Sequence, residues 1–221
     1  MYELAETGST NSDLIEHHLA LPDRSVLRTD HQTAGRGRLD RRWDAPPGSN
    51  LLASLLFHEV PADPGELMRR VALAAVNAVR SPGGGAAAAD VVLKWPNDIL
   101  LGGLKLAGLL AQRAGGGSIV VGIGINVGWA PEGAAQLGGG ARPAAVLAAL
   151  LEAYDTLPAQ IDGLYRDELA TLGQRVRVEL PTGDLTGTAV DVEADGRLVV
   201  IDDCAISHRF SIGDVVHLRR A

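Results

Sequence analysis

The segment Gln32–Trp43, QTAGRGRLDRRW, concentrates groups that bind anions. Arg36, Arg38, Arg41 and Arg42 surround two glycines within it. Guanidinium groups bind phosphate oxygens in a fixed geometry, and glycine lets a backbone approach a ligand closely. The spacing matches neither the phosphate loop GxxxxGK[ST] nor the dinucleotide motif GxGxxG. A solvated basic loop is the alternative, but the density of arginine favours a site for a small anion.

Two further segments, GSTN (residues 8–11) and KWPND (residues 94–98), carry polar groups where regular elements begin or end. The hydroxyls and the amide of GSTN could bind a polar ligand at a helix N-terminus, or they could simply cap the helix. Lys94, Asn97 and Asp98 could bind phosphates and a hydrated Mg²⁺ ion. An ordinary Asn-Asp turn after proline is the alternative for KWPND.

Two apolar segments contain residues that a buried strand does not need. In GGLKLAGLL (residues 102–110), Lys105 alternates with leucines, so its ammonium faces the other side, toward a site or toward water. In VVGIGINV (residues 120–127), Gly122 and Gly124 share one face. Glycine inside a strand often marks the close approach of a ligand or a backbone, although tight packing against a helix is the alternative.

Composition limits the classes of protein that the chain can represent. Its 221 residues carry a formal net charge of -7, and 46% are hydrophobic. An acidic balance argues against broad DNA binding, which depends on phosphate neutralisation. The single cysteine, Cys204, is typical of a reducing cytosol. Because the chain has neither a signal peptide at its start nor about 18 consecutive apolar residues, we expect a cytoplasmic protein without a membrane span.

The motifs lie on a regular succession of expected elements. A helix is expected after Thr10 as N-cap, with Asp13 completing a variant of the capping box. Further helices are expected over residues 65–80, 143–157 and roughly 159–172, and strands over residues 50–57, 91–95, 98–101, 105–113 and 118–129. After Gly173, short alternating segments separated by turns predict a small barrel. The expected domains are therefore residues 1–172 and 173–221.

Taken together and in this order, the motifs STN, GRGRxxRxW, KWPND, KLAG and GIGIN resemble those of the biotin protein ligases. The resemblance covers Leu4 to about Val127 by motif. It extends to the C-terminus by layout, because this family also ends in a small SH3-like β-barrel. It implies an α+β fold, in which helices flank a mixed β-sheet of the class II synthetase-like type.

The resemblance implies a biotin–[acetyl-CoA-carboxylase] ligase. Such an enzyme uses ATP to convert biotin to biotinyl-5′-AMP, and then transfers biotin to a lysine of a biotin carboxyl carrier protein. Biotin is a substrate and not a permanent prosthetic group, and Mg²⁺ accompanies ATP. The implied protein is a monomer or a homodimer. Since STN begins at Ser9, we expect no N-terminal helix-turn-helix and no DNA-binding function.

The resemblance also assigns roles to individual residues. Biotin is expected to contact Ser9, Thr10, Asn11, Gln32, Gly35, Arg36, Gly37, Arg38, Lys105, Gly108, Gly122 and Gly124. ATP and the adenylate are expected to contact Arg38, Arg41, Trp43, Lys94, Asn97, Lys105 and Asn126, with Asp98 as the ligand of Mg²⁺. The expected catalytic residues are Lys105, Arg38 and Arg36. Their charges would offset the repulsion between the two anionic substrates.

Two alternatives remain open: a lipoate or octanoyl transferase of the same fold, and a non-catalytic protein that binds biotin or its adenylate. The GRGR and KWPND motifs argue against the first, and Lys105, Arg38 and Asp98 argue against the second. Two departures from the family are Asp40, where a glycine is frequent, and Gln112, where many members have glutamate and little effect on chemistry is expected. Residues 36–47 are expected to be poorly ordered until ligands bind.

Overall fold

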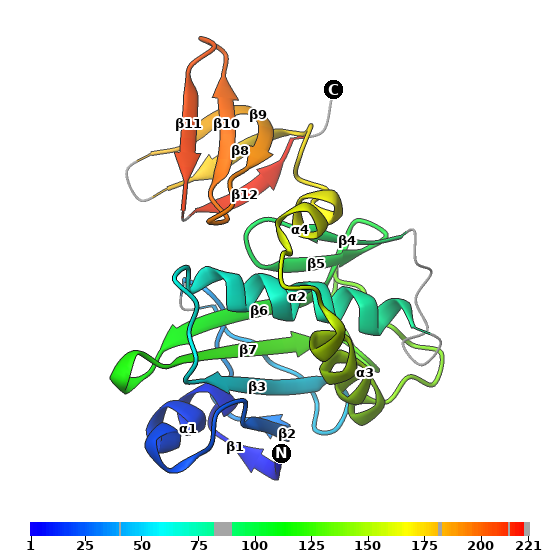
Figure 1. The fold of residues 1–221 in the computed structure, drawn as a ribbon. Coiled ribbons are helices and arrows are strands. Elements are labelled where there is room, and N and C mark those ends of the chain that lie inside the picture. Colours follow the sequence, from blue (N-terminus) through cyan, green and yellow to red (C-terminus); the bar gives the residue numbers. More distant parts are fainter. Residues whose placement is uncertain (40, 82–89, 181–182, 212, 219–221) are drawn as a thin grey trace.

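The computed structural model describes residues 1–39, 41–81, 90–180, 183–211 and 213–218. Two β-sheets lie at opposite ends of the molecule, and the helices gather around the larger one (Figure 1). Within the described residues, the larger sheet has seven strands in the order β1-β2-β3-β7-β6-β5-β4. Their bounds are Tyr2–Thr7 (β1), Val26–Gln32 (β2), Leu51–Phe57 (β3), Val91–Lys94 (β4), Asp98–Leu101 (β5), Leu104–Arg113 (β6) and Ile119–Ile125 (β7).

The larger sheet is mixed. β1 runs parallel to β2, whereas the other neighbouring strands described here pair antiparallel. At the centre, the register of β3 and β7 places Ser54 opposite Gly122, and Leu52 opposite Gly124. Every residue of β3 is buried, which explains why this strand is a nearly continuous apolar run.

Helices cover both faces of this sheet. Consecutive strand residues point to opposite faces of the sheet, so the contacts of Leu55 and Leu56 in β3 show which helices cover each face. Leu56 packs with Leu14 of α1 (Thr10–His17), whereas Leu55 belongs to the core shared with α2 (Gly65–Arg80) and α3 (Pro143–Thr156). α2 and α3 therefore lie together on one face, as Figure 1 shows, and α1 lies on the other. None of the helices in the described ranges is long and apolar enough to cross a membrane.

The smaller sheet follows α4 (Asp162–Glu168) and is antiparallel throughout the residues described. There it has five strands in the order β11-β10-β9-β8-β12. Their bounds are Arg175–Glu179 (β8), Leu185–Val192 (β9), Leu198–Asp202 (β10), Ser207–Phe210 (β11) and Asp214–His217 (β12). We call this sheet the C-terminal barrel, after the small barrel that the sequence predicts; its closure into a barrel stays a prediction. The predicted domain boundary at residues 172 and 173 falls between α4 and β8, and it stays a prediction.

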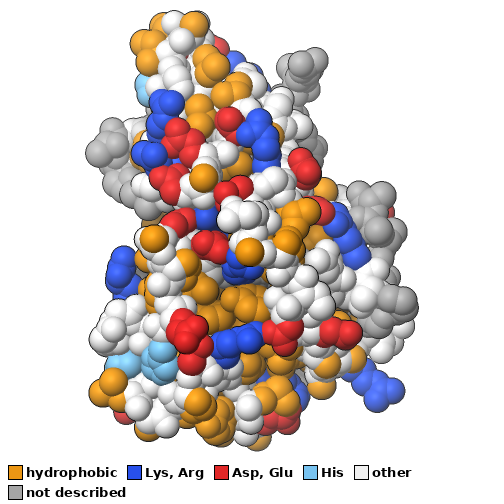
Figure 2. All heavy atoms as spheres, viewed as in Figure 1, with side chains coloured by type: hydrophobic (Ala, Val, Ile, Leu, Met, Phe, Trp, Pro, Cys, Tyr) orange, Lys and Arg blue, Asp and Glu red, His pale blue; other side chains and the backbone are white. Residues whose placement is uncertain are grey.

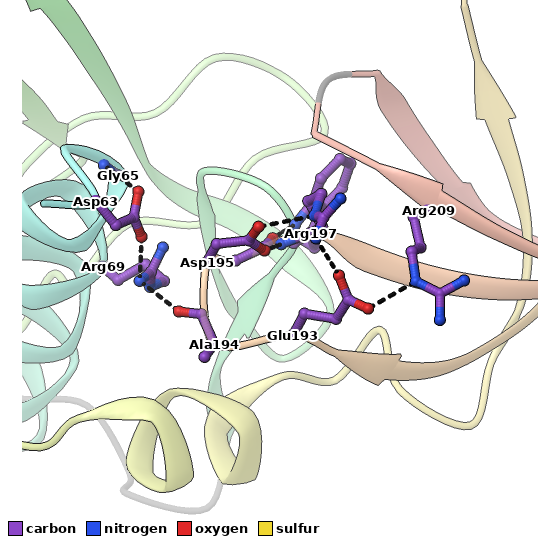
Figure 3. Close-up of polar contacts among 10 residues, drawn as sticks. Asp63, Gly65, Arg69, Glu193, Ala194, Asp195, Arg197 and Arg209 are labelled. Carbon is purple, nitrogen blue, oxygen red and sulfur yellow. Dashed lines mark hydrogen bonds and ion pairs between the residues drawn. The ribbon is translucent and has the colours of Figure 1, made fainter.

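A turn of the C-terminal barrel is bonded directly to the larger part of the molecule (Figure 3). The buried guanidinium of Arg69 in α2 donates hydrogen bonds to Asp63, at 2.7 Å, and to the carbonyl of Ala194, at 2.9 Å. The indole of Trp95 donates to the carbonyl of Gly196, two residues further along, at 2.9 Å. Because buried polar groups are costly to leave unpaired, these bonds favour one orientation of the barrel.

The predicted α+β class is confirmed, as are most of the predicted elements. Two local predictions are wrong. Ser9, not Thr10, is the N-cap of α1, because the Thr10 backbone N–H already donates to Gln32 and the helix begins there. The expected capping box is not formed, since the Asp13 carboxylate accepts a hydrogen bond from the Thr7 hydroxyl instead.

The helix expected over residues 159–172 is also shorter than predicted. α4 ends at Glu168, because the chain beyond it pairs with the end of β4: Leu169 bridges Leu93, and the N–H of Ala170 donates to the Leu93 carbonyl at 2.9 Å. The strands β1, β2 and β11 were not among the predicted elements.

Candidate functional site

A cavity of about 260 Å³ lies on the face of the larger sheet that carries α1. Its walls come from the start of α1, the segment after β2, strands β3, β5, β6 and β7, and the first residue of β12. It is lined by Ser9, Thr10, Asn11, Gln32, Arg36, Gly37, Arg38, Arg41, Arg42, Trp43, Asp44, Ala53, Asn97, Asp98, Lys105, Gly108, Leu109, Leu110, Gly122, Ile123, Gly124, Asn126, Pro131, Ala134 and Asp214. The cavity therefore combines amides and hydroxyls with an unusual number of charges.

The lining of the cavity includes a fixed amide. The side-chain oxygen of Gln32 accepts hydrogen bonds from the backbone N–H of Thr10, at 2.9 Å, and from the Thr10 hydroxyl, at 3.1 Å. A backbone N–H can only donate, so the amide of Gln32 is held with its oxygen toward Thr10. Its NH₂ group is left as the donor for a ligand.

Beside it, Asn11 is held by three protein groups and is only 5% exposed. Its amide nitrogen donates to the carbonyl of Leu110, at 3.2 Å, and to the side-chain oxygen of Gln112, at 2.7 Å. Its amide oxygen accepts a 2.6 Å hydrogen bond from the hydroxyl of Ser54. The orientation of this amide is therefore also fixed.

The floor of the cavity is built from glycines on neighbouring strands. A methyl group added to Gly122 would lie 2.2 Å from the side-chain oxygen of Asn11, and one added to Gly124 would lie 2.4 Å from the ring of Trp43. Gly108 stands opposite Gly124 in the sheet, and its methyl would meet the same ring at 3.1 Å. A methyl group at residue 122 or 124 would therefore displace a motif side chain, whereas one at residue 108 would only crowd the ring of Trp43.

The arginine-rich segment folds back on itself above this floor. The N–H of Gly37 donates to the Arg41 carbonyl at 2.6 Å, and the N–H of Trp43 donates to the carbonyl of Gly35 at 3.0 Å. From this turn, the guanidinium of Arg38 reaches into the cavity and donates to the side-chain oxygen of Asn97 at 3.1 Å. The segment can therefore act as a lid over the glycine floor.

The C-terminal barrel contributes a carboxylate to the same place. Asp214 forms an ion pair with Arg41, and its carboxylate lies 3.6 Å from Arg38. Arg38 also donates to the carbonyl of Gly213 at 3.1 Å. Burial lowers the pKa of Arg38, and the nearby carboxylates of Asp214 and Asp98 partly offset this effect. A guanidinium stays charged at neutral pH despite such a shift, so Arg38 remains a cation for ligands.

Lys105 also faces the cavity and has a carboxylate partner there. Its ammonium lies 2.7 Å from the Asp98 carboxylate and 5.7 Å from the centre of the Trp43 ring. The indole N–H of Trp43 is buried and has no hydrogen-bond acceptor among the residues that the structure describes. An ammonium ion and an indole donor near one another suit an anionic or polar ligand.

Two asparagines of the motifs support the walls. The amide of Asn97 donates to the Leu109 carbonyl at 2.7 Å, tying the turn between β4 and β5 to β6. The amide of Asn126, which is 3% exposed, donates to the carbonyl of Ala135 at 3.0 Å. Both side chains therefore have structural bonds in addition to any contact with a ligand.

The structure brings nearly all predicted site residues together. Gly35 and Lys94 are the exceptions, since neither lines the cavity. Gly35 instead allows the carbonyl of Trp43 to approach, because a methyl there would lie 2.3 Å from that oxygen. Lys94 lies close enough to His217 to contribute to the lowered pKa of that imidazole. The contact of Lys94 with a nucleotide stays a prediction, and Asp40 lies outside the described residues.

Sequence reasoning missed the lining residues Asp44 and Asp214, and also Ser54, which lies behind the lining and bonds to Thr10 and Asn11. Ser54 is the single polar residue of the run LLASLLF, and its isolation among apolar residues was a usable signal. Asp214 carries no such signal, since it is one of many charged residues in the C-terminal segments. Its role emerges only when the barrel is placed against the arginine-rich segment.

Comparison with known proteins identifies the family. The family model for the biotin/lipoate A/B protein ligases matches residues 5–129, and the biotin protein ligase C-terminal domain matches residues 171–218. The chain belongs to the biotin/lipoate A/B protein ligase family. The predicted membership among the biotin protein ligases is thereby confirmed.

Individual relatives agree with this assignment over nearly the whole chain. The biotin–[acetyl-CoA-carboxylase] ligase of Mycobacterium tuberculosis is 39% identical, over 98% of this chain and 88% of the relative. The ligase of the same name from Paracoccus denitrificans is 33% identical, over 90% of each chain. The structure of the Aquifex aeolicus biotin protein ligase with biotin and ATP is 25% identical, covers 99% of this chain and 98% of its own, and superposes with a TM-score of 0.80.

Proposed function

We propose that the protein is an ATP-dependent biotin–[acetyl-CoA-carboxylase] ligase. It activates biotin to biotinyl-5′-AMP and transfers the biotinyl group to a lysine of a biotin carboxyl carrier domain. The observation that carries this proposal is a single cavity that joins two kinds of chemistry. The fixed amide of Gln32 lies in the same lining as the cations of Arg38 and Lys105. A neutral polar ring and a phosphate can therefore be bound side by side.

The Gln32 amide suits the cyclic urea of biotin. A urea has a carbonyl that needs donors and N–H groups that need acceptors, inside an otherwise apolar pocket. The NH₂ group of Gln32 supplies donors, and the hydroxyl of Thr10 can supply an acceptor. The glycine floor around Gly122 leaves room for the ring system to lie flat on the sheet.

The cations suit the activation step. An oxygen of the biotin carboxylate attacks the α-phosphorus of ATP, a new O–P bond forms, and the bond to pyrophosphate breaks. Two anions must approach each other, so fixed cations in a shielded site lower the barrier. Lys105 and Arg38 supply these charges, together with Arg36. Asp98 pairs with Lys105 and Asp214 pairs with Arg38, and we expect the anionic groups of the substrates to compete with these carboxylates.

The transfer step needs no nucleophile from the enzyme. The amine of the carrier lysine attacks the carbonyl carbon of the mixed anhydride, loses a proton, and releases AMP. What the enzyme must do is hold the adenylate and exclude water until the carrier arrives. The segment Arg36–Trp43 suits this task, because its turn lies above the cavity and its arginines line it.

The residues present fit a magnesium ion that is held mainly by phosphate oxygens and water, since Mg²⁺ commonly uses only one or two carboxylates. Asp98 is the proposed protein ligand and lies in the cavity lining. No group of three or more possible metal ligands occurs within the described ranges, which is consistent with an ion that arrives with ATP. When bound, the ion would neutralise charge on the phosphates.

Transfer to a carrier tests the proposed function. The protein is incubated with biotin, MgATP and a biotin carboxyl carrier domain, and the carrier lysine is examined by mass spectrometry. We expect one biotinyl group on that lysine, and none with lipoate or octanoate. Lys105→Ala should slow adenylate formation by an amount equivalent to ~3–4 kcal/mol, as for a lost oxyanion donor. Arg113→Ala, an exposed residue at the end of the same strand, should not. Transfer of lipoate or octanoate in place of biotin would refute the proposal.

We further propose a cytoplasmic enzyme that acts on the carrier domain of a biotin-dependent carboxylase, as a monomer or a homodimer. The names of the Mycobacterium tuberculosis and Paracoccus denitrificans relatives support a carboxylase as the source of the carrier. Gel filtration with and without biotin and ATP would determine the oligomeric state.

A further inference from the structure

Ser54 is a polar residue in a place where a hydroxyl is costly. It lies in β3, whose seven residues LLASLLF are all buried, and Ser54 itself is 0% exposed. Transferring a hydroxyl from water to an apolar interior is unfavourable unless it finds hydrogen-bond partners. Its partners therefore reveal what the residue does.

Both partners of Ser54 belong to the STN motif of α1. The Ser54 hydroxyl donates to the side-chain oxygen of Asn11 at 2.6 Å and lies 2.7 Å from the hydroxyl of Thr10. The amide oxygen of Asn11 can only accept, so the single hydroxyl proton of Ser54 is directed to Asn11. The Thr10 hydroxyl also has one proton, and two acceptors lie within reach of it: the Ser54 oxygen at 2.7 Å and the side-chain oxygen of Gln32 at 3.1 Å.

This count of protons assigns both hydroxyls. Ser54 donates to Asn11, Asn11 donates to Gln112, and the proton of Thr10 goes to Ser54 or to Gln32, both of which belong to the protein. Because the proton of Thr10 is committed to the protein, its hydroxyl presents lone pairs to the cavity. Thr10 is thereby an acceptor, whereas the neighbouring NH₂ group of Gln32 is a donor. A cyclic urea offers the complementary pair, an N–H and a carbonyl.

We propose that Ser54 is a positioning residue that holds the oxygen of Asn11 and, together with Gln32, keeps the proton of Thr10 within the protein, and so favours a cyclic urea as the ligand. This inference rests on the proposed function and adds a residue that the motifs do not contain. The register of the sheet supports it, since Ser54 stands opposite Gly122, the position at which the Asn11 side chain lies against the sheet. Replacing Ser54 would leave both motif side chains in place, but it would remove the donor to the Asn11 oxygen and one of the two acceptors for the Thr10 proton.

The experiment compares Ser54→Ala with a matched control, Ser25→Ala. Ser25 is also a buried serine, at 5% exposure, but its hydroxyl has no hydrogen-bond partner among the described residues. For each protein, the Kd values for biotin and for desthiobiotin, which keeps the cyclic urea, are measured by calorimetry. The KM values for biotin and for ATP are measured in the carrier assay.

We expect Ser54→Ala to weaken the binding of biotin and desthiobiotin by the same factor, about tenfold, because one neutral hydrogen bond is lost. The KM for ATP should stay within about twofold, and Ser25→Ala should match the wild type in every measurement. Gln112→Leu, at a partly exposed position, should also weaken biotin binding, and Gln112→Glu should restore it by keeping an acceptor for Asn11.

Biotin binding by Ser54→Ala within about twofold of wild type would overturn the inference. An equal rise in the KM values for biotin and ATP would also overturn it, since that result indicates general disorder of the cavity. Wild-type protein that fails to bind biotin would instead refute the proposed function. The two failures are therefore distinguishable.

Discussion

The substitution Gly122→Ala tests the tightest contact in the site. A methyl group there would lie 2.2 Å from the side-chain oxygen and 2.9 Å from the amide carbon of Asn11. β7 cannot move away, because it is paired on both sides, with β3 and β6. The amide of Asn11 must therefore leave its position and lose its bonds to Ser54, Gln112 and the Leu110 carbonyl. At about 1 kcal/mol for each bond, the expected loss of stability is roughly 3 kcal/mol.

Urea unfolding measures this loss, and calorimetry measures the accompanying loss of biotin affinity. Gly163→Ala serves as the control, because Gly163 lies in α4, has an ordinary φ, and has no atom within 4 Å of the added methyl. The control should be neutral or slightly stabilising, since alanine favours a helix. Gly122→Ala that unfolds within about 0.5 kcal/mol of wild type and binds biotin normally would refute the argument that Asn11 is fixed against the sheet.

Three further predictions concern charged or titratable groups on the C-terminal barrel or in contact with it. Arg38→Gly removes a guanidinium that is expected to bind the phosphate of biotinyl-5′-AMP, so the adenylate should dissociate and label lysines of a bystander protein. Tight retention of the adenylate by this variant would contradict the expected role of Arg38. Asp214→Asn removes the carboxylate that competes with phosphates for Arg38 and Arg41, so the KM for ATP in initial-rate assays should fall about threefold. A higher KM for ATP would show that Asp214 does not compete with the nucleotide. Burial, with a smaller effect of Lys94, lowers the pKa of His217 below 6.5, so protonation favours the unfolded state. The contribution of neutral His217 to the free energy of unfolding should be complete above pH 6.5 and should be lost as the pH falls through the lower pKa of the folded state. In urea unfolding, His217→Gln should therefore lose less stability than the wild type as the pH falls. An equal loss in both proteins would contradict the assignment.

The sequence predicted the site well where a motif lies on a regular element. The run Leu51–Phe57 is apolar and bounded by polar residues, so a buried strand was the natural prediction. The alternation of glycine and isoleucine after Val121 correctly separated Gly122 and Gly124 from the core-facing residues, because strand side chains alternate strictly between faces. Local periodicity was sufficient in both cases.

The sequence could not predict features that depend on distant partners. β1 is largely exposed, so it has no apolar alternation and is defined only by its parallel pairing with β2. α4 is cut short by the pairing of Leu169 and Ala170 with Leu93, and that pairing overrides helix propensity. Asp214 comes to the cavity from a separate sheet, and no local pattern encodes that approach.

The position of Asp214 explains how an acidic chain can keep a strongly basic cavity. Lys105 is paired with Asp98, and Asp214 is paired with Arg38 and Arg41, so these cations do not form an open field for polyanions. On the face shown in Figure 2, acidic and basic side chains are likewise interspersed over the C-terminal barrel. A ligand set that brings a carboxylate and a phosphate can replace Asp98 at Lys105 and Asp214 at the arginines. A single anion can replace only one of these carboxylates. We therefore expect the internal carboxylates to favour the combination of substrates over either anion alone, and the barrel to contribute to this selection through Asp214.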